Sequence, residues 1–171
     1  MKKLLLPILI TLSTTILAKT PESLFGVYIN DNVLDYVTQK ELKSKYRDYA
    51  RGFYYVKIKN PPVSNKDYSD NLWVTFDKNN KIHSIQSDKK FQNSETCEKV
   101  EYGVRRQLET KYNFEFRRNT RNNNTFSKLV GDNWILTSCT AGDDDTKLLI
   151  YLQTKEHRDK FRQQLLKGGN R

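Results

Sequence analysis

The sequence predicts an α+β fold, in which an antiparallel sheet of about six strands has helices packed on one face and carries one disulfide. Two observations lead to this class. Short segments of alternating apolar and polar residues recur between turn residues, as in half-buried strands. One longer segment instead repeats its apolar residues at steps of three and four, as an amphipathic helix does. We expect residues 19–171 to form one domain, because this length suits a single core.

The strand signals are clearest in the first half of the chain. Residues 53–59 alternate, and Asn60-Pro61-Pro62 ends the segment because proline cannot donate to a strand ladder. Residues 72–76 alternate in the same way, and residues 77–80 supply the turn of a hairpin. On its return strand Ile82 and Ile85 lie three residues apart, which indicates a β-bulge.

The longest predicted helix runs from about residue 94 to Tyr112. Asn93 or Ser94 can cap it, and Asn113 is a suitable left-handed stop. Its apolar residues form one stripe, made of Cys97, Val100, Val104, Leu108 and Tyr112. Near the start of the chain we expect a strand in residues 24–29 and a helix carrying Val33, Leu34 and Val37. Later elements are strands over 114–118, 126–130, 134–140 and 147–153, and a basic helix over 154–166 with Phe161 and Leu165 inward.

The chain begins with the pattern of an export signal over residues 1–18. Lys2 and Lys3 precede an apolar stretch, and Ala18 is the small residue expected at the cleavage site. A spanning helix needs about 20 mainly apolar residues, so the alternative of an uncleaved anchor suits this diluted stretch less well. No cysteine follows the stretch, so a lipoprotein anchor is excluded. We expect a soluble periplasmic or secreted protein with no transmembrane segment after cleavage.

Cys97 and Cys139 are the two cysteines of the chain. In an oxidising compartment such a pair usually forms a structural disulfide. The bridge would join the long helix to a strand. The spacing does not have the Cys-x-x-Cys form of a redox site.

The formal net charge is +10, or +8 once Lys2 and Lys3 leave with the signal. A basic surface favours anionic partners such as phospholipid headgroups or acidic glycans, although a biased genome composition explains the charge equally well. Export makes nucleic acid an unlikely partner. Arg117, Arg118 and Arg121 crowd one predicted hairpin and are candidate binding residues.

Aromatic residues supply the second candidate surface. Phe53, Tyr55 and Trp73 fall opposite the aliphatic faces of their strands. An exposed aromatic face binds sugars or a protein partner, whereas a sheet covered on both faces would make these residues core. The sequence leaves both possibilities open.

No catalytic, metal-binding or cofactor-binding motif is present, so no catalytic residue, metal or cofactor is assigned. His83 and His157 are the two histidines, and ordinary packing explains each better than a catalytic role. The alternative to a binding role is a small secreted hydrolase with its site in the Tyr46–His83 region, near Asp67, Asp70 or His83.

The hairpin phrase Leu72-Trp73-Val74-Thr75-Phe76-Asp77, with Lys81 and Ile82 after the turn, resembles a hairpin of small exported bacterial domains. These are helix-plus-β-meander domains of the β-lactamase-inhibitor-like and outer-membrane-assembly lipoprotein types. The resemblance implies a binding or assembly role rather than catalysis, and no functional residue is carried over. We therefore expect an exported, non-enzymatic protein that binds an envelope protein or an anionic envelope component.

Overall fold

The computed structural model describes residues 18–48, 50, 52–120, 124–142 and 145–168. The predicted export signal lies outside these residues except for Ala18, and Arg121 lies outside them as well. From Lys19 onward the chain is tied to the fold, because the Lys19 backbone N–H donates to the Tyr112 carbonyl at 2.8 Å. No helix within the described residues is long and apolar enough to span a membrane.

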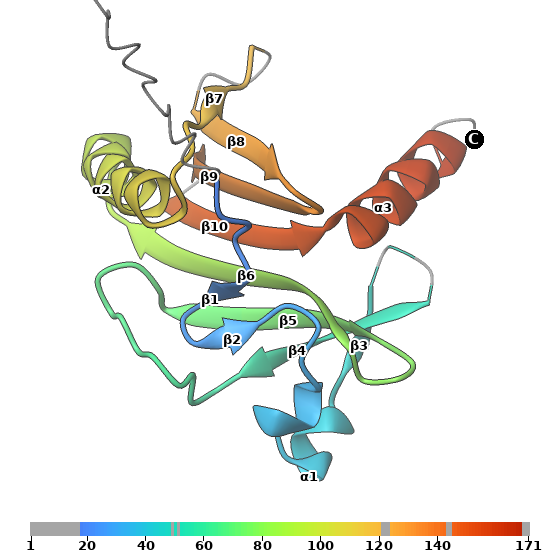
Figure 1. The fold of residues 1–171 in the computed structure, drawn as a ribbon. Helices are drawn as coiled ribbons and strands as arrows, with labels where there is room; N and C mark the ends of the chain where they lie inside the picture. The colour runs from blue at the N-terminus through green and yellow to red at the C-terminus, as the bar shows by residue number, and fades with distance from the viewer. Residues whose placement is uncertain (1–17, 49, 51, 121–123, 143–144, 169–171) are drawn as a thin grey trace, which may run out of the picture.

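An eight-stranded antiparallel sheet forms the body of the described chain, in the order β3-β4-β5-β6-β10-β9-β8-β7 (Figure 1). Its six longer strands are β4 (Phe53–Ile58), β5 (Asn71–Asp77), β6 (Ile82–Phe91), β8 (Thr125–Val130), β9 (Asn133–Ala141) and β10 (Thr146–Thr154). Two-residue strands, β3 (Tyr46–Arg47) and β7 (Arg117–Arg118), lie at the two edges. A separate pair, β1 (Ser23–Leu24) and β2 (Val27–Tyr28), forms a two-stranded sheet. The predicted α+β class and antiparallel sheet are thus confirmed.

Three α-helices and one 3-10 turn complete the described fold. They are η1 (Val33–Asp35), α1 (Gln39–Leu42), α2 (Ser94–Tyr112) and α3 (Lys155–Gly168). The predicted ends of α2 are confirmed, since the Asn93 side chain accepts from the Thr96 N–H at 2.9 Å and Asn113 adopts a left-handed φ of 52°. The bulge expected in the hairpin is also present, as a register shift between Thr75 and Phe76.

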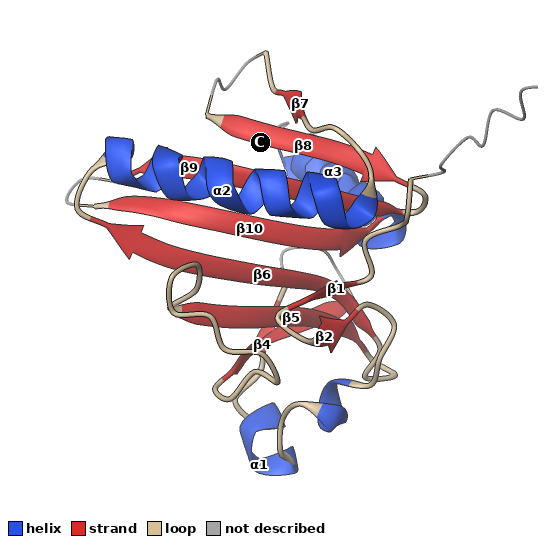
Figure 2. Cartoon of the chain, turned by 60° about the vertical axis from the view of Figure 1, so that its left-hand side comes forward, coloured by secondary structure: helices blue, strands red, loops and turns tan. Residues whose placement is uncertain are grey.

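One face of the sheet, called here the first face, carries the core. Alternate residues of β10, namely Leu148, Ile150 and Leu152, are almost fully buried on it. Val74 and Ile85 extend this apolar layer across the paired strands β5 and β6. Helix α2 lies across the first face, and β1 and β2 lie beside it in front of β5 and β6 (Figure 2). These residues belong to the hydrophobic core, whose burial stabilises the fold.

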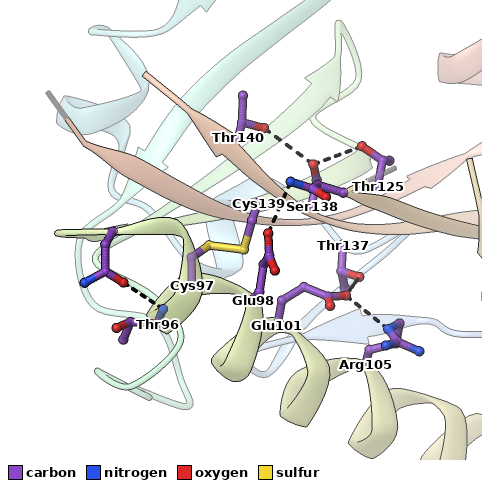
Figure 3. Close-up of a disulfide and its surroundings, with 12 residues drawn as sticks. Thr96, Cys97, Glu98, Glu101, Arg105, Thr125, Thr137, Ser138, Cys139 and Thr140 are labelled. Carbon is purple, nitrogen blue, oxygen red and sulfur yellow. Dashed lines mark hydrogen bonds and ion pairs between the residues drawn. A yellow bond between two sulfur atoms is a disulfide. The ribbon is translucent and has the colours of Figure 1, made fainter. Parts of the chain in front are cut away.

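A disulfide joins α2 to the first face. Cys97 in the first turn of α2 is bonded to Cys139 of β9, and both cysteines are buried (Figure 3). One turn further along α2, the buried Glu101 accepts hydrogen bonds from the Thr137 hydroxyl of β9 and from Arg105. The predicted bridge is therefore present, and a buried carboxylate lies beside it.

Helix α3 lies on the opposite side of the sheet from α2, as both overall views show (Figures 1 and 2). The sequence-based expectation placed all helices on one face, and α3 differs in this detail. Its first turn continues directly from β10, and its buried His157 packs against Phe53 on the second face. Farther along α3, Leu165 is 50 % exposed, so the predicted inward position of this residue is not observed. Helix α3 therefore covers only one part of the second face.

Candidate functional site: an aromatic cleft on the second face

The second face of the sheet presents two cross-strand rows of side chains. The first row is Trp73, Gln86, Tyr151 and Leu136, which pair in register across β5, β6, β10 and β9. The second row is Tyr55, Thr75, Ser84 and Gln153, which pair across β4, β5, β6 and β10. Because paired residues of neighbouring strands lie side by side on one face, these rows form a continuous floor.

The start of α3 forms a wall over this floor. The His157 ring approaches the Asp48 carboxylate with Nε2 at 2.7 Å and the Gln153 side-chain oxygen with Nδ1 at 3.3 Å. This histidine thereby joins α3, β10 and the loop between β3 and β4. Phe161, one helical turn later on α3, also lines the space over the floor.

Floor and wall enclose a cleft of about 520 Å³, here called the aromatic cleft. It is lined by Asp48, Tyr55, Trp73, Thr75, Gln86, Leu136, Tyr151, Gln153, His157 and Phe161. Its volume lies within the range of roughly 300–1,000 Å³ that is usual for small-molecule sites. Mainly aromatic walls with a few polar groups are also typical of such sites.

The aromatic residues predicted as binding candidates fall into two groups. Tyr55 and Trp73 are partly exposed in the cleft, with ring centroids 5.8 Å apart and ring planes at 66°. Phe53 is 2 % exposed and packs edge-on against His83 and His157 at 5.0 and 4.9 Å. Phe53 is thus covered by the start of α3 and does not line the cleft.

The aromatic surface continues to the sheet edge. Tyr46 of β3 stacks on Tyr55 at 5.2 Å between ring centroids and is 56 % exposed. The strand register places Tyr46 directly opposite Tyr55. The cleft therefore extends into an exposed tyrosine at its β3 end.

Three polar groups of the cleft have no hydrogen-bond partner within the described part of the chain: the Tyr55 hydroxyl, the Trp73 indole N–H and the Gln86 amide. They are not buried, so water hydrates them in the free protein. A ligand that replaces this water with its own polar groups would recover the same hydrogen bonds.

The cleft carries little charge. None of its described lining residues is a lysine or arginine, and its single carboxylate, Asp48, is bonded to His157. Burial raises the pKa of the Tyr151 hydroxyl to about 12, although a hydrogen bond with Ser84 opposes this shift, and the negative charge of Asp48 adds to it. The Tyr151 hydroxyl therefore stays protonated at neutral pH.

The two basic side chains of α3 described next do not line the cleft, because each lies over another ring and pairs with a carboxylate. Lys160 lies over the Phe53 ring at 4.9 Å and pairs with Glu156 at 2.9 Å. Arg158 lies over the Trp134 ring at 5.0 Å and pairs with Asp159 at 3.2 Å.

The predicted arginine surface lies away from the aromatic cleft. Arg117 and Arg118 are exposed on the edge strand β7, and Arg118 lies 5.9 Å from the Phe126 ring centre. Arg105 of α2 covers the same ring at 4.1 Å and pairs with Glu101 at 3.3 Å. The structure therefore does not bring these arginines together with Tyr55 and Trp73.

A separate hollow of about 450 Å³ is lined by His83 and three carboxylates, those of Asp132, Glu156 and Asp159. This is the arrangement that a hydrolase would favour. His83, however, is 2 % exposed, and its Nε2 and Nδ1 atoms lie 3.2 Å from Asp77 and 3.3 Å from Thr154. Asp70 instead pairs with Lys89 and lines a different hollow, and Asp67 lines neither.

No cluster of three or more potential metal-ligating side chains occurs among the described residues. Comparison with known proteins adds no candidate function, since no family model, curated protein or solved structure matches the chain.

Sequence reasoning found two lining residues, Tyr55 and Trp73, and missed Gln86, Tyr151 and Phe161. The missed residues meet the others only because β6 pairs with β10, a contact between distant parts of the chain. The alternation of residues in β10 could have indicated Tyr151, because it places this side chain on the face of the sheet opposite to the buried Ile150.

Proposed function

We propose that this chain is an exported, non-enzymatic binding protein whose ligand site is the aromatic cleft. The observation that carries the proposal is the open set of polar groups on Tyr55, Trp73 and Gln86 between aromatic walls. Burying aromatic surface would supply affinity, and the polar groups would orient the ligand.

Three features support export. The first residues have the pattern of a signal, the buried cysteines form a bridge suited to an oxidising compartment, and Lys19 is already anchored by its backbone. Cleavage after Ala18 would therefore leave the fold intact in the periplasm or outside the cell. Mass spectrometry of the exported protein is expected to give a first residue at or near Lys19, and an intact Met1 would contradict export with cleavage.

A cell-envelope component is the proposed partner. An anionic component would meet the edge carrying Arg117 and Arg118, because the cleft has no lysine or arginine among its described lining residues. The resemblance to exported helix-plus-meander domains supports the same kind of role.

The proposal is tested by a fragment screen on the disulfide-bonded protein, followed by ¹H–¹⁵N NMR. Fragments are expected to shift the signals of Trp73, Gln86 and Tyr151. Trp73→Ala is expected to weaken binding about tenfold, as truncation of a central aromatic anchor does. Tyr28→Ala, an exposed tyrosine on β2 of the other face, is the matched control and should bind as the wild type does. Hits that cluster elsewhere, or that survive Trp73→Ala unchanged, would contradict the cleft as the site.

The second candidate function is hydrolysis at the hollow beside His83, which its three neighbouring carboxylates favour. Both ring nitrogens of His83 and of His157 lie within hydrogen-bond distance of other side chains. Neither histidine is therefore placed to act as a base on a substrate. Chromogenic ester, phosphate and glycoside substrates are expected to show no turnover above buffer. Turnover that falls about 100-fold in His83→Gln would establish the hydrolase instead.

A further inference from the structure

We infer that the aromatic cleft binds a neutral saccharide, with a sugar ring stacked on Trp73 and its hydroxyls bonded to Gln86. This inference rests on the proposed binding function and names the ligand class for the same site.

The first argument is that the cleft places an aromatic ring beside a side-chain amide, which matches the two kinds of surface of a sugar. A pyranose ring has an apolar face of C–H groups and a rim of hydroxyls. Trp73 is the aromatic ring of the cleft floor that such a face can stack on, because Tyr55 meets it edge to face and is itself stacked on Tyr46. The Gln86 amide lies next to Trp73 in the cross-strand row. A side-chain amide both donates and accepts, so it matches neighbouring hydroxyls, which do the same.

The second argument is electrostatic. A chain with a formal charge of +10 would be expected to place cations in a site for an anionic sugar. The described lining contains no lysine or arginine, and Lys160 and Arg158 are held on other rings and carboxylates. Lys57, which pairs in register with Trp73, does not line the cleft and donates a hydrogen bond to the Asn71 side chain. A cationic ligand is also not favoured, because the Asp48 carboxylate already bonds His157. A neutral ligand avoids the desolvation cost that an unpaired charge would carry in this cleft.

The third argument separates a sugar from a peptide. An extended peptide adds to a sheet through main-chain hydrogen bonds at an open strand edge. The lining side chains of the sheet instead come from β4, β5, β6, β10 and β9, which are each paired on both sides, and the edge strand β3 lies beyond them. Only side-chain groups are offered there, and these suit a ligand recognised by its hydroxyls.

The test uses Trp73 as the reporter in a Trp134→Phe background, since these are the two tryptophans of the chain. The probes are cellobiose, maltose and N,N′-diacetylchitobiose, with glucuronate and protonated glucosamine as charged sugars. At least one neutral disaccharide is expected to change the Trp73 fluorescence saturably and to shift the Gln86 side-chain signal in ¹H–¹⁵N spectra.

Variants then assign the contacts. Trp73→Ala is expected to weaken saccharide binding at least about tenfold, because the stacking ring is removed. Trp73→Phe keeps a ring and loses the indole N–H, and Gln86→Leu keeps volume and loses the amide. Each should weaken binding about threefold, as expected for one lost hydrogen bond. Tyr28→Ala should not change saccharide binding. Binding to all of these variants is measured by NMR, so the result does not depend on the fluorescence of Trp73.

Binding of the charged sugars alone, or of an aromatic hexapeptide in preference to every disaccharide, would overturn the saccharide assignment. If no sugar binds while fragments still bind the cleft, the ligand class is wrong and the proposed binding function stands. If neither sugars nor fragments bind there, both proposals fall.

Discussion

The two faces of the sheet are closed in different ways. On the first face, α2, the disulfide and the β1–β2 pair cover Leu148, Ile150 and Leu152, whose exposed fractions are 0, 2 and 0 %. On the second face, the alternating residues Leu149 and Tyr151 of the same strand stay partly exposed, and α3 covers one part (Figure 1). The difference separates two tasks within one sheet: the first face stabilises the fold, and the second is free to bind a ligand.

The largest expected effect comes from opening the bridge that closes the first face. Replacing both cysteines, as Cys97→Ser with Cys139→Ser, removes a crosslink between residues 42 apart in sequence. The free energy of unfolding is expected to fall by about 4 kcal/mol in the chain-entropy account. Urea unfolding of this variant, compared with the oxidised and the reduced wild-type protein, measures the loss. A loss below about 1 kcal/mol would show that α2 is held by packing alone.

Neighbouring leucines of β10 test the difference between the faces directly. Leu148→Ala opens a cavity under α2 and is expected to cost about 3 kcal/mol. Leu149→Ala removes the same side chain from the partly exposed second face and is expected to cost less than about 1 kcal/mol. Thermal and urea unfolding of the two variants gives the comparison, and equal losses would mean that the second face is packed as a core.

Two buried titratable groups, one near each face, should make the folding stability depend on pH in opposite directions. Burial lowers the pKa of His83 below 6.5, with a partial opposing effect of Asp77. The unfolded chain then binds the proton at higher pH than the folded chain, so stability falls as the pH drops below about 6.5. Burial raises the pKa of Glu101 above 4.5, although Thr137 and Arg105 oppose this shift. The contribution of Glu101 to the folding stability is therefore present at low pH and is lost as the pH rises through the pKa of Glu101 in the folded state.

Unfolding free energies measured in urea between pH 4 and 8 separate these effects. His83→Gln is expected to flatten the acid-side loss, and Glu101→Gln is expected to remove the opposing trend. Profiles parallel to that of the wild type in both variants would mean that neither group changes its pKa on folding.

The smallest expected effect belongs to the aromatic cleft itself. Trp73→Ala should cost no more than about 1 kcal/mol of stability, since the side chain is only partly buried and lies opposite the core. Circular dichroism melting measures this cost. A much larger loss would show that Trp73 is structural, and binding defects of this variant would then need Gln86→Leu as their test.

Local signals predicted much of the fold. The cap, stripe and stop of α2 depend on residues close in sequence, and the bulge between Thr75 and Phe76 was visible in the spacing of Ile82 and Ile85. The strand order was not predictable, because β6 pairs with β10, which is distant in sequence, and this pairing leaves no local pattern. The buried Glu101 and Glu109 on α2 were missed for the same reason. Their partners include Thr137 of β9 and the Phe116 N–H, outside the helix.

The cleft was predictable only in part. Alternation placed Tyr55 and Trp73 on the face opposite the aliphatic residues, which the structure confirms. The burial of Phe53 could not be predicted, because it depends on His83 and His157 from separate segments. Alternation assigns a residue to a face, whereas exposure depends on what long-range packing places over that face.

The position of β10 has a consequence for how the chain reaches its fold. Two meanders, β3 to β6 and β7 to β10, are each built from strands adjacent in sequence, and the pairing of β6 with β10 joins them in one sheet. Until these two strands pair, β6 and β10 are open edges next to apolar side chains. Local hairpins form before distant strands pair, so the pairing of β6 with β10 is expected to be the slow step of folding. A chain ending at residue 145 lacks β10, so β6 and β9 should remain open edges and the chain should aggregate during refolding, which light scattering would detect.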